Sequence, residues 1–229
     1  HQQNKRRISV ILGNPPYNAN QMNENDNNKN RLYAGIDERI KDTWIAASRA
    51  QKTKMYDMYA RFFRWAADRI DGDGIIAYIT NRSFIDSRTF DGFRMEMARE
   101  FNECWIVDLG GDVRANPKLS GTTHNVFGIQ TGVAISFWIK KKLPSPAGRG
   151  AGGVGRRQKH TCKIFYARRP EMESAADKLG WLGDTPFAEV EFTHITPDDK
   201  GNWINLADND FDELLPLCSK ETKAAKTPN

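Results

Sequence analysis

Residues 8–17 read ISVILGNPPY, a short apolar run that passes through a glycine into an asparagine, two prolines and a tyrosine. The run Ile8–Leu12 is rich in β-branched residues and is typical of a buried strand. Proline fixes its own φ and biases the residue before it toward extended backbone. Pro15 and Pro16 are therefore expected to hold Asn14 in one stiff geometry at the end of that strand.

The loop at the end of this strand suits a planar amine. The side-chain oxygen of Asn14 and the carbonyl of Pro15 are two acceptors with fixed directions, which match the two N–H donors of one NH2 group. Tyr17 supplies a flat face on which a heteroaromatic ring can stack. Two aligned acceptors stabilise the positive charge that develops on nitrogen during attack on an electrophilic methyl group. We interpret Asn14, Pro15, Pro16 and Tyr17 as catalytic residues; the alternative is a surface turn after a buried strand.

The segments that follow alternate between helical and strand patterns. Helical segments show apolar residues at a spacing of three and four, whereas the strands are short apolar runs suited to a sheet buried on both faces. The order strand, helix, strand, helix, strand, strand predicts an α/β fold. The expected elements are a helix at 55–70, a turn at 71–74, a strand at 75–79, a helix at 90–101, and strands at 104–109 and 132–139.

The strand followed by Asn14-Pro15-Pro16-Tyr17 resembles the catalytic motif of S-adenosylmethionine-dependent amino-group methyltransferases, above all the DNA adenine methyltransferases. In that family the motif ends the fourth strand, and the last two strands form a hairpin whose seventh strand is antiparallel. The resemblance covers roughly residues 8–142 and is greatest to large bacterial restriction-modification enzymes, including the type ISP group. It implies the C-terminal half of a Rossmann-like class I methyltransferase sheet, with helices on both faces.

The same resemblance implies roles for two further aromatic residues. Phe62 resembles the aromatic that lines the cofactor's adenine pocket, and Asn14 is implied to face the cofactor as well. Phe127 resembles the aromatic that packs against the flipped base, where Tyr17 also stacks. The alternatives are ordinary helix core for Phe62 and a structural role for Phe127.

The family's cofactor site begins with a glycine-rich turn after the first strand and has an acidic residue at the end of the second. The seven residues before Ile8 cannot contain them. Gly110-Gly111-Asp112 lacks a convincing helix behind it, and Gly148–Gly155 lacks the Gly-Lys-Ser/Thr ending of a phosphate loop. We therefore expect a fragment that requires an upstream part of the same polypeptide and is inactive in isolation.

A stretch rich in proline, glycine and arginine predicts a boundary inside the chain. Beyond it, the pattern predicts strands at 161–166 and 187–192 and a short helix at 171–179. The expected division is a catalytic half at 1–143, a flexible basic linker or loop at 144–160, and a small α/β extension at 161–229 that leads toward a target-recognition region.

A formal net charge of +5 is compatible with a polyanionic partner. The candidate DNA phosphate contacts are Lys140, Lys141, Lys142, Arg156 and Arg157. The alternative for these cations is a solvated face or linker. We expect the partner to be double-stranded DNA with a flipped adenine.

The remaining signals limit the class of protein. Cys104, Cys162 and Cys218 are too scattered for a metal knuckle, so we expect no metal and a reduced, cytoplasmic protein. No apolar run reaches the length of a membrane span, and no signal peptide is visible. We therefore expect no membrane partner.

The function hypothesis is transfer of a methyl group from S-adenosylmethionine to the exocyclic amine of adenine in DNA, within a restriction-modification enzyme. Because adenine in a duplex is inaccessible to attack, the base must leave the stack at a cost of a few kcal/mol. Methylation of cytosine, of RNA adenine or of a protein glutamine amide remains open, because each presents a planar NH2 group. A catalytically silent DNA-binding module is the alternative from another class.

Overall fold

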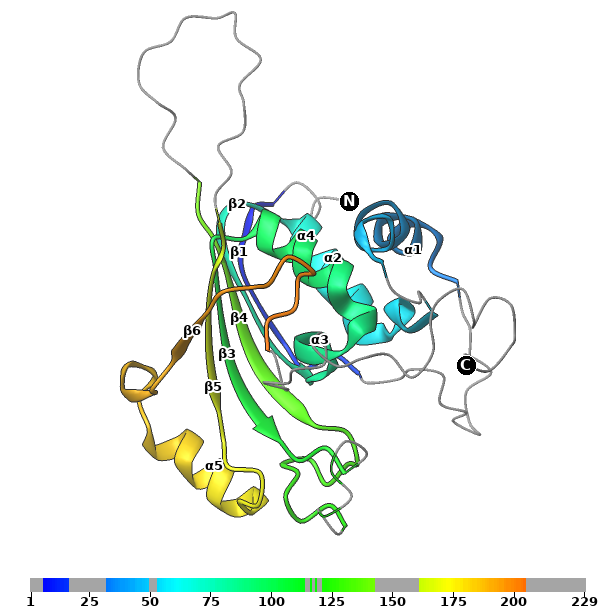
Figure 1. The fold of residues 1–229 in the computed structure, drawn as a ribbon. Helices are drawn as coiled ribbons and strands as arrows, with labels where there is room; N and C mark the ends of the chain where they lie inside the picture. Colours follow the sequence, from blue (N-terminus) through cyan, green and yellow to red (C-terminus); the bar gives the residue numbers. More distant parts are fainter. Residues whose placement is uncertain are drawn as a thin grey trace, which may run out of the picture.

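In a computed structural model of the chain, the residues described are 6–16, 32–49, 53–113, 116, 118, 121–142 and 161–204. Within them, one sheet of six strands has the order β1-β2-β4-β3-β5-β6 (Figure 1). The strands are β1 Ile8–Gly13, β2 Ile70–Asn81, β3 Glu103–Gly110, β4 Val133–Lys140, β5 Lys163–Arg168 and β6 Thr193–Ile195. The α-helices are α1 Ala34–Ile40, α2 Met58–Arg69, α3 Ser83–Asp86, α4 Asp91–Glu100 and α5 Ala175–Asp184. Shorter helical turns are the π-helix η2 Lys41–Ile45 and the 3-10 turns η3 Thr53–Tyr56, η4 Arg88–Phe90 and η5 Phe187–Glu189.

The sheet is parallel except for β4 and β6. β1 pairs parallel with β2, and β3 pairs parallel with β5, whereas β4 lies antiparallel between β2 and β3. The carboxyl ends of β1, β2, β3 and β5 therefore meet at one edge of the sheet, which we call the carboxyl edge (bottom of Figure 1). β4 begins at this edge and ends at the opposite one, the amino edge. This arrangement confirms the expected α/β fold and its final hairpin.

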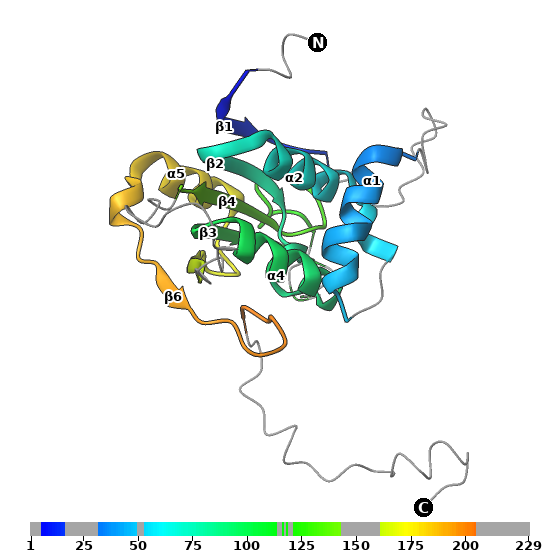
Figure 2. The same ribbon diagram turned by 90° about the horizontal axis from the view of Figure 1, so that it is seen from above.

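One face of the sheet is covered by α2 and α4, and α1 packs outside them (Figure 2). Residues such as Tyr59, Phe63 and Ala67 place the apolar side of α2 on the core, as the spacing predicts. α4 approaches η2 so closely that a Cβ on Gly92 would lie 1.9 Å from the carbonyl oxygen of Trp44. No helix in the described part of the chain is long and apolar enough to cross a membrane.

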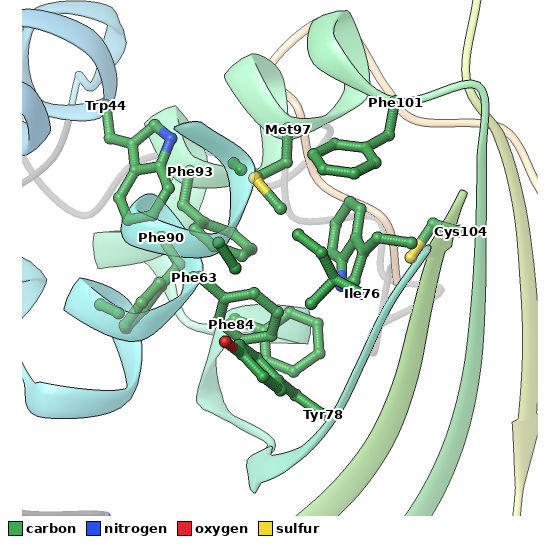
Figure 3. Packing of buried hydrophobic residues seen from close by; sticks show 14 of the residues in the cluster. Trp44, Phe63, Ile76, Tyr78, Phe84, Phe90, Phe93, Met97, Phe101 and Cys104 are labelled. Carbon is green, nitrogen blue, oxygen red and sulfur yellow. The ribbon is translucent and has the colours of Figure 1, made fainter. Parts of the chain in front are cut away.

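The core under these helices is largely aromatic (Figure 3). Phe93 lies 5.3 Å from Phe63 and 5.8 Å from Trp138 between ring centroids, both in edge-on contact. All three side chains have no exposed surface. Such edge-to-face pairs add specific geometry to the free energy of burying large rings. The predicted helices at 55–70 and 90–101 are therefore confirmed by the contacts they make, with α2 beginning at Met58.

α5 packs on the second face of the sheet, which confirms helices on both faces (Figure 1). Its Trp181 packs with the buried Val107 and Val133 of the sheet. At the β1 end of this face, however, Val10 and Leu12 are 59% and 72% exposed. Within the described residues β1 is therefore an edge strand, and of its residues only Ile11 is buried.

Two predicted elements differ from the structure. Residues 71–74 do not end the segment with a turn, because β2 begins already at Ile70 and bulges there, with Gly72 at a φ of 87°. Residues 187–192 alternate as a strand would, yet the only strand of this region within the described residues is β6. Phe187 and Phe192 both pack on Trp105, at 5.5 and 5.0 Å between centroids, and this contact with the sheet outweighs the local pattern.

The extension continues the catalytic sheet. β5 pairs with β3 from Glu103↔Lys163 to Asp108↔Arg168, which confirms a strand close to the predicted 161–166. The helix predicted at 171–179 lies further along the chain, at Ala175–Asp184. The division at 143 and 160 falls outside the described residues and stays a prediction.

Candidate active site at the carboxyl edge

The candidate catalytic loop leaves the sheet at the carboxyl end of β1. Asn14 and Pro16 are exposed, and Pro15 between them is buried. Gly13 pairs with Tyr78 of β2, and a Cβ on Gly13 would lie 3.1 Å from the Tyr78 ring. The buried proline therefore anchors the loop while the Asn14 side chain stands at the surface. Tyr17 lies outside the described residues.

Both aromatic residues with implied roles are partly exposed. Phe62 lies on α2 with 38% of its surface exposed, and Phe127 lies between β3 and β4 with 44% exposed. Within the described residues, Phe62 is therefore not part of the buried core. Contact of Phe62 with the cofactor and of Phe127 with a base remain predictions.

The fold brings Asn14 and the loop that carries Phe127 to the same edge of the sheet. β1 and β4 are separated only by β2, which corresponds to about 10 Å at 4.8 Å per strand. Residues 121–131, which we call the Phe127 loop, lead into the start of β4 at this edge. Asn14 and the Phe127 loop therefore follow neighbouring parts of the same edge, with one strand between them.

A buried ionic cluster lies at the same edge, and the sequence patterns did not predict it. The Arg82 guanidinium donates to both carboxylate oxygens of Asp108, with the shortest contact at 2.9 Å, and it pairs with Asp86 at 2.8 Å. The Tyr166 hydroxyl donates to Asp108 at 2.7 Å. Asp108 has no exposed surface, so its charge depends on these donors. The cluster joins the ends of β2, β3 and β5.

The same neighbours control the ionisation of this cluster. Burial of Arg82 opposes its charge, but Asp108 outweighs burial and holds the pKa of Arg82 well above its ordinary value. Burial and the adjacent Asp108 carboxylate raise the pKa of Tyr166, which therefore stays a hydroxyl donor. One sequence signal could have pointed here: Arg82 directly follows a strand that ends at the carboxyl edge, where polar side chains from several strands converge.

Beside the cluster, a polar pocket of about 590 Å³ opens at the carboxyl edge. This volume lies in the range of small-molecule sites. Its arginines are paired with acids, since Arg168 pairs with Glu171 and Arg169 with Glu173. The lining residues are Arg82, Asp86, Gly110, Asp112, Asn116, Arg168, Arg169, Pro170 and Glu171. In the described ranges, no three His, Cys, Asp or Glu side chains gather as metal ligands would.

The described candidates for phosphate contact lie away from the candidate catalytic loop. Lys140 is the last residue of β4, and Lys141 and Lys142 follow it at the amino edge, about 25 Å from the start of the strand at roughly 3.3 Å per residue. The Lys140 ammonium donates to the carbonyl oxygen of Ile70 at 3.2 Å, and Lys141 pairs with Glu103 at 2.6 Å. Arg156 and Arg157 lie outside the described residues.

Comparison with known proteins is consistent with this geometry. Residues 1–114 match the family described as Eco57I restriction-modification methylase. Among curated proteins, none matches the chain. The chain is 47% identical to the protein in a cryoEM structure of a DrdV-DNA complex, with a TM-score of 0.80 over 98% of this chain and 21% of that one.

Two type ISP restriction-modification enzymes are also similar. A nuclease-deletion mutant of LlaGI, in complex with a DNA substrate mimic, is 32% identical with a TM-score of 0.80, over 96% of this chain and 20% of that one. The ATP-dependent enzyme LlaBIII, bound to DNA, is 33% identical with a TM-score of 0.75, over 96% and 14%. The chain thus spans about a fifth or less of each of these proteins. Through residues 1–114 it belongs to the Eco57I restriction-modification methylase family, and over nearly its whole length it is similar to type ISP restriction-modification enzymes.

Proposed function

We propose that this chain forms the catalytic half of an S-adenosylmethionine-dependent methyltransferase that acts on the exocyclic amine of adenine in duplex DNA. The observation that carries the proposal is the stiff loop of Asn14, Pro15 and Pro16 at the carboxyl end of β1, in a chain of a restriction-modification methylase family. The DNA complexes of DrdV and LlaBIII, and the complex of LlaGI with a DNA substrate mimic, support DNA as the partner. We assign the enzyme to the bacterial cytoplasm because its proposed substrate is DNA.

Asn14 and Pro15 orient the amine of an adenine that has left the stack. The side-chain oxygen of Asn14 and the carbonyl oxygen of Pro15 accept its two N–H groups. Because Pro15 is buried and Asn14 stands between the sheet and two prolines, these acceptors need little reorganisation when substrate arrives. Tyr17 and Phe127 supply aromatic faces for the extruded base, and each stacked face contributes about 1–3 kcal/mol.

S-adenosylmethionine, when bound, supplies the electrophilic methyl group. The residues at hand fit part of this cofactor. The partly exposed ring of Phe62 would be suited to stack on its adenine, and Asn14, exposed at the carboxyl end of β1, would face it. In the part of the chain that the structure describes, no glycine-rich strand-to-helix turn is present to hold the methionyl end. We assign that role to an upstream part of the same polypeptide.

The test is methylation of duplex DNA by the enzyme that carries this chain, followed by digestion to nucleosides and identification of the methylated base. We expect N6-methyladenine. Asn14→Ala should raise the activation free energy of methyl transfer by about 2.7–4 kcal/mol, by analogy with loss of one oxyanion-hole donor. The affinity for DNA should change little. Tyr17→Ala should lose about 1–3 kcal/mol of base stacking, and Tyr17→Phe much less.

Asn202→Ala is the matched control, because among the described residues the hydrogen bonds of Asn202 are all to Asp198 of the same loop, at 2.8 Å from its side-chain nitrogen. It should retain the full rate. A methylated cytosine, a methylated RNA or a methylated protein amide would overturn the adenine assignment. DNA binding without methyl transfer to any of these would instead identify a silent binding module.

A further inference from the structure

The buried side chain of Asn125 forms four hydrogen bonds in and around the Phe127 loop. Asn125 is only 3% exposed. Its amide nitrogen donates to the carbonyl oxygens of Gly111 at 3.1 Å and Thr131 at 2.8 Å. Its amide oxygen accepts from the backbone N–H groups of Phe127 at 3.0 Å and Ile129 at 3.3 Å. The side chain therefore ties the loop to Gly111, just after β3, and to Thr131 at the loop's own end, and it holds the backbone of Phe127.

These bonds use both donors of the primary amide and both lone pairs of its oxygen. An aspartate at this position would keep the two acceptor contacts and lose the two donor contacts. The fit around the loop is close, since Gly111 adopts a φ of 74° and a Cβ on it would lie 2.7 Å from the carbonyl oxygen of His124. The site around Asn125 thus requires a side chain with two donors and two acceptors, which the primary amide provides.

α5 fastens the same loop from a distant part of the sequence. The side chain of Lys178 has no exposed surface, and its ammonium donates to the carbonyl oxygen of His124 at 2.7 Å. Nearby, the backbone N–H of Ala175 donates to the carbonyl oxygen of Thr123 at 2.9 Å. A buried ammonium is strongly destabilising unless an acceptor meets it. Movement of the loop away from α5 would remove that acceptor, so Lys178 opposes the movement.

We propose that Asn125 and Lys178 are positioning residues for Phe127, which they hold at the carboxyl edge where it meets an extruded base. Both act through the backbone of the Phe127 loop and not by touching the base. The inference rests on the proposed function, because Phe127 meets a base only in an enzyme that extrudes one. It gives α5, which lies beyond the basic linker, a part in base extrusion.

A double-mutant cycle in the intact enzyme tests the proposal. The probe is a duplex with 2-aminopurine at the target adenine, whose fluorescence rises when the base leaves the stack. Phe127→Ala should lower the extrusion equilibrium by about 5- to 150-fold, which corresponds to loss of one base-aromatic stack. Asn125→Ala and Lys178→Met should each lower it by part of that factor. In the Phe127→Ala background, neither should lower it further, since their effect passes through that ring.

Two controls match these substitutions. Asn202, which also serves as the control for methyl transfer, is hydrogen bonded to Asp198 at 2.8 Å. Lys163 is an exposed lysine at the start of β5. Asn202→Ala and Lys163→Met should leave the fluorescence at the wild-type level. Asn125→Asp, which keeps the acceptor contacts to Phe127 and Ile129, should retain more extrusion than Asn125→Ala.

Independent, multiplying losses from Asn125→Ala and Phe127→Ala would show that Asn125 acts on folding alone, and the inference would be wrong while adenine methylation stood. An inert Phe127→Ala would remove the role of Phe127 and this inference together, again without touching the methyl-transfer activity. If Asn125→Ala does not fold, Lys178→Met on α5 carries the same cycle. Absence of any methylated adenine in the wild type is the separate result that would end the proposed function.

Discussion

The two edges of the sheet differ in how far their ion pairs are exposed to solvent. At the carboxyl edge, Arg82 and Asp108 are paired in the interior, with side chains 6% and 0% exposed. At the amino edge, Lys141 and Glu103 form a pair of the same kind with side chains 58% and 22% exposed. A buried pair is strongly coupled to the fold around it, whereas an exposed pair contributes about 0–1 kcal/mol. The more strongly fold-coupled ion pair thus lies at the carboxyl edge, which also carries the candidate catalytic loop.

The acids at the two edges differ in the same sense. Asp57 precedes α2 near the carboxyl edge, and burial raises the pKa of its carboxyl to about 6. At the amino edge, the hydrogen bond from Lys141 lowers the pKa of Glu103. Burial thus opposes the ionisation of Asp57 at the carboxyl edge, whereas Lys141 favours the ionisation of Glu103 at the amino edge. Three predictions test how far this contrast extends.

The largest effect is expected from breaking the buried pair. Asp108→Ala leaves the Arg82 guanidinium in the interior with only Asp86 as an ionic partner. It should lower the free energy of unfolding by about 3–5 kcal/mol, measured by urea denaturation. Glu103→Ala at the amino edge is the matched change and should cost at most about 1 kcal/mol. Equal losses from the two variants would contradict the contrast between the edges.

Asp57 should make stability depend on pH. Between pH 3.8, the ordinary pKa, and about 6, the folded protein keeps a proton that the unfolded chain has released. The contribution of Asp57 to the free energy of unfolding is therefore fully present below this window and falls as pH rises through it, by up to about 3 kcal/mol. Asp57→Asn, which keeps a favourable residue before the helix, should remove the dependence and stabilise the protein at pH 7.

The pH contrast has its own control at the amino edge. Because the pKa of Glu103 is lowered, its contribution is lost as pH falls, which is the opposite slope. Glu103→Gln should remove only that weak slope. Thermal melts of both variants from pH 3.5 to 7 measure the difference. The contrary result is a wild-type protein whose stability increases from pH 4 to 6 while the stability of Asp57→Asn stays constant over that range. It would show that Asp57 is ionised in the folded state.

The smallest effect is expected from the exposed lysines. If Lys141 and Lys142 contact DNA phosphates, neutralising both should reduce the slope of log affinity against log salt by about 1.8 for duplex DNA. Sequence preference should persist, since phosphate contacts do not read bases. The rate at saturating DNA should also persist, because these residues lie at the edge opposite Asn14. An unchanged slope would identify them as a solvated face.

Much of the fold could be predicted because its signals are local. The apolar runs that form β1, β3 and β4 and the helical spacing of α2 and α4 are each visible within a dozen residues. Phe187 and Phe192 show where local pattern fails. Their alternation is typical of a strand, but contact with Trp105 places them in a turn and a loop instead.

In the candidate site, too, the features that depend on neighbouring residues could be predicted from the sequence, and contacts between distant residues could not. The stiffness of the loop of Asn14, Pro15 and Pro16 could be predicted because proline fixes its own φ and restricts the residue before it. Asp108 and Tyr166 are 58 positions apart, and Lys178 and His124 are 54 apart. No periodicity connects such residues, so the sequence patterns did not predict their contacts.

By itself, the sequence determined the α/β class, the stiff Asn-Pro-Pro loop at a strand end and the resemblance to amino-group methyltransferases, because each depends on neighbouring residues. Only the tertiary structure decided that Arg82, Asp108 and Tyr166 form one buried cluster and that Asn125 and Lys178 fasten the loop of Phe127. The physical reason is that the sheet brings distant strand ends to one edge. Burial there makes each unpaired polar group so unfavourable that partners must be found across the fold.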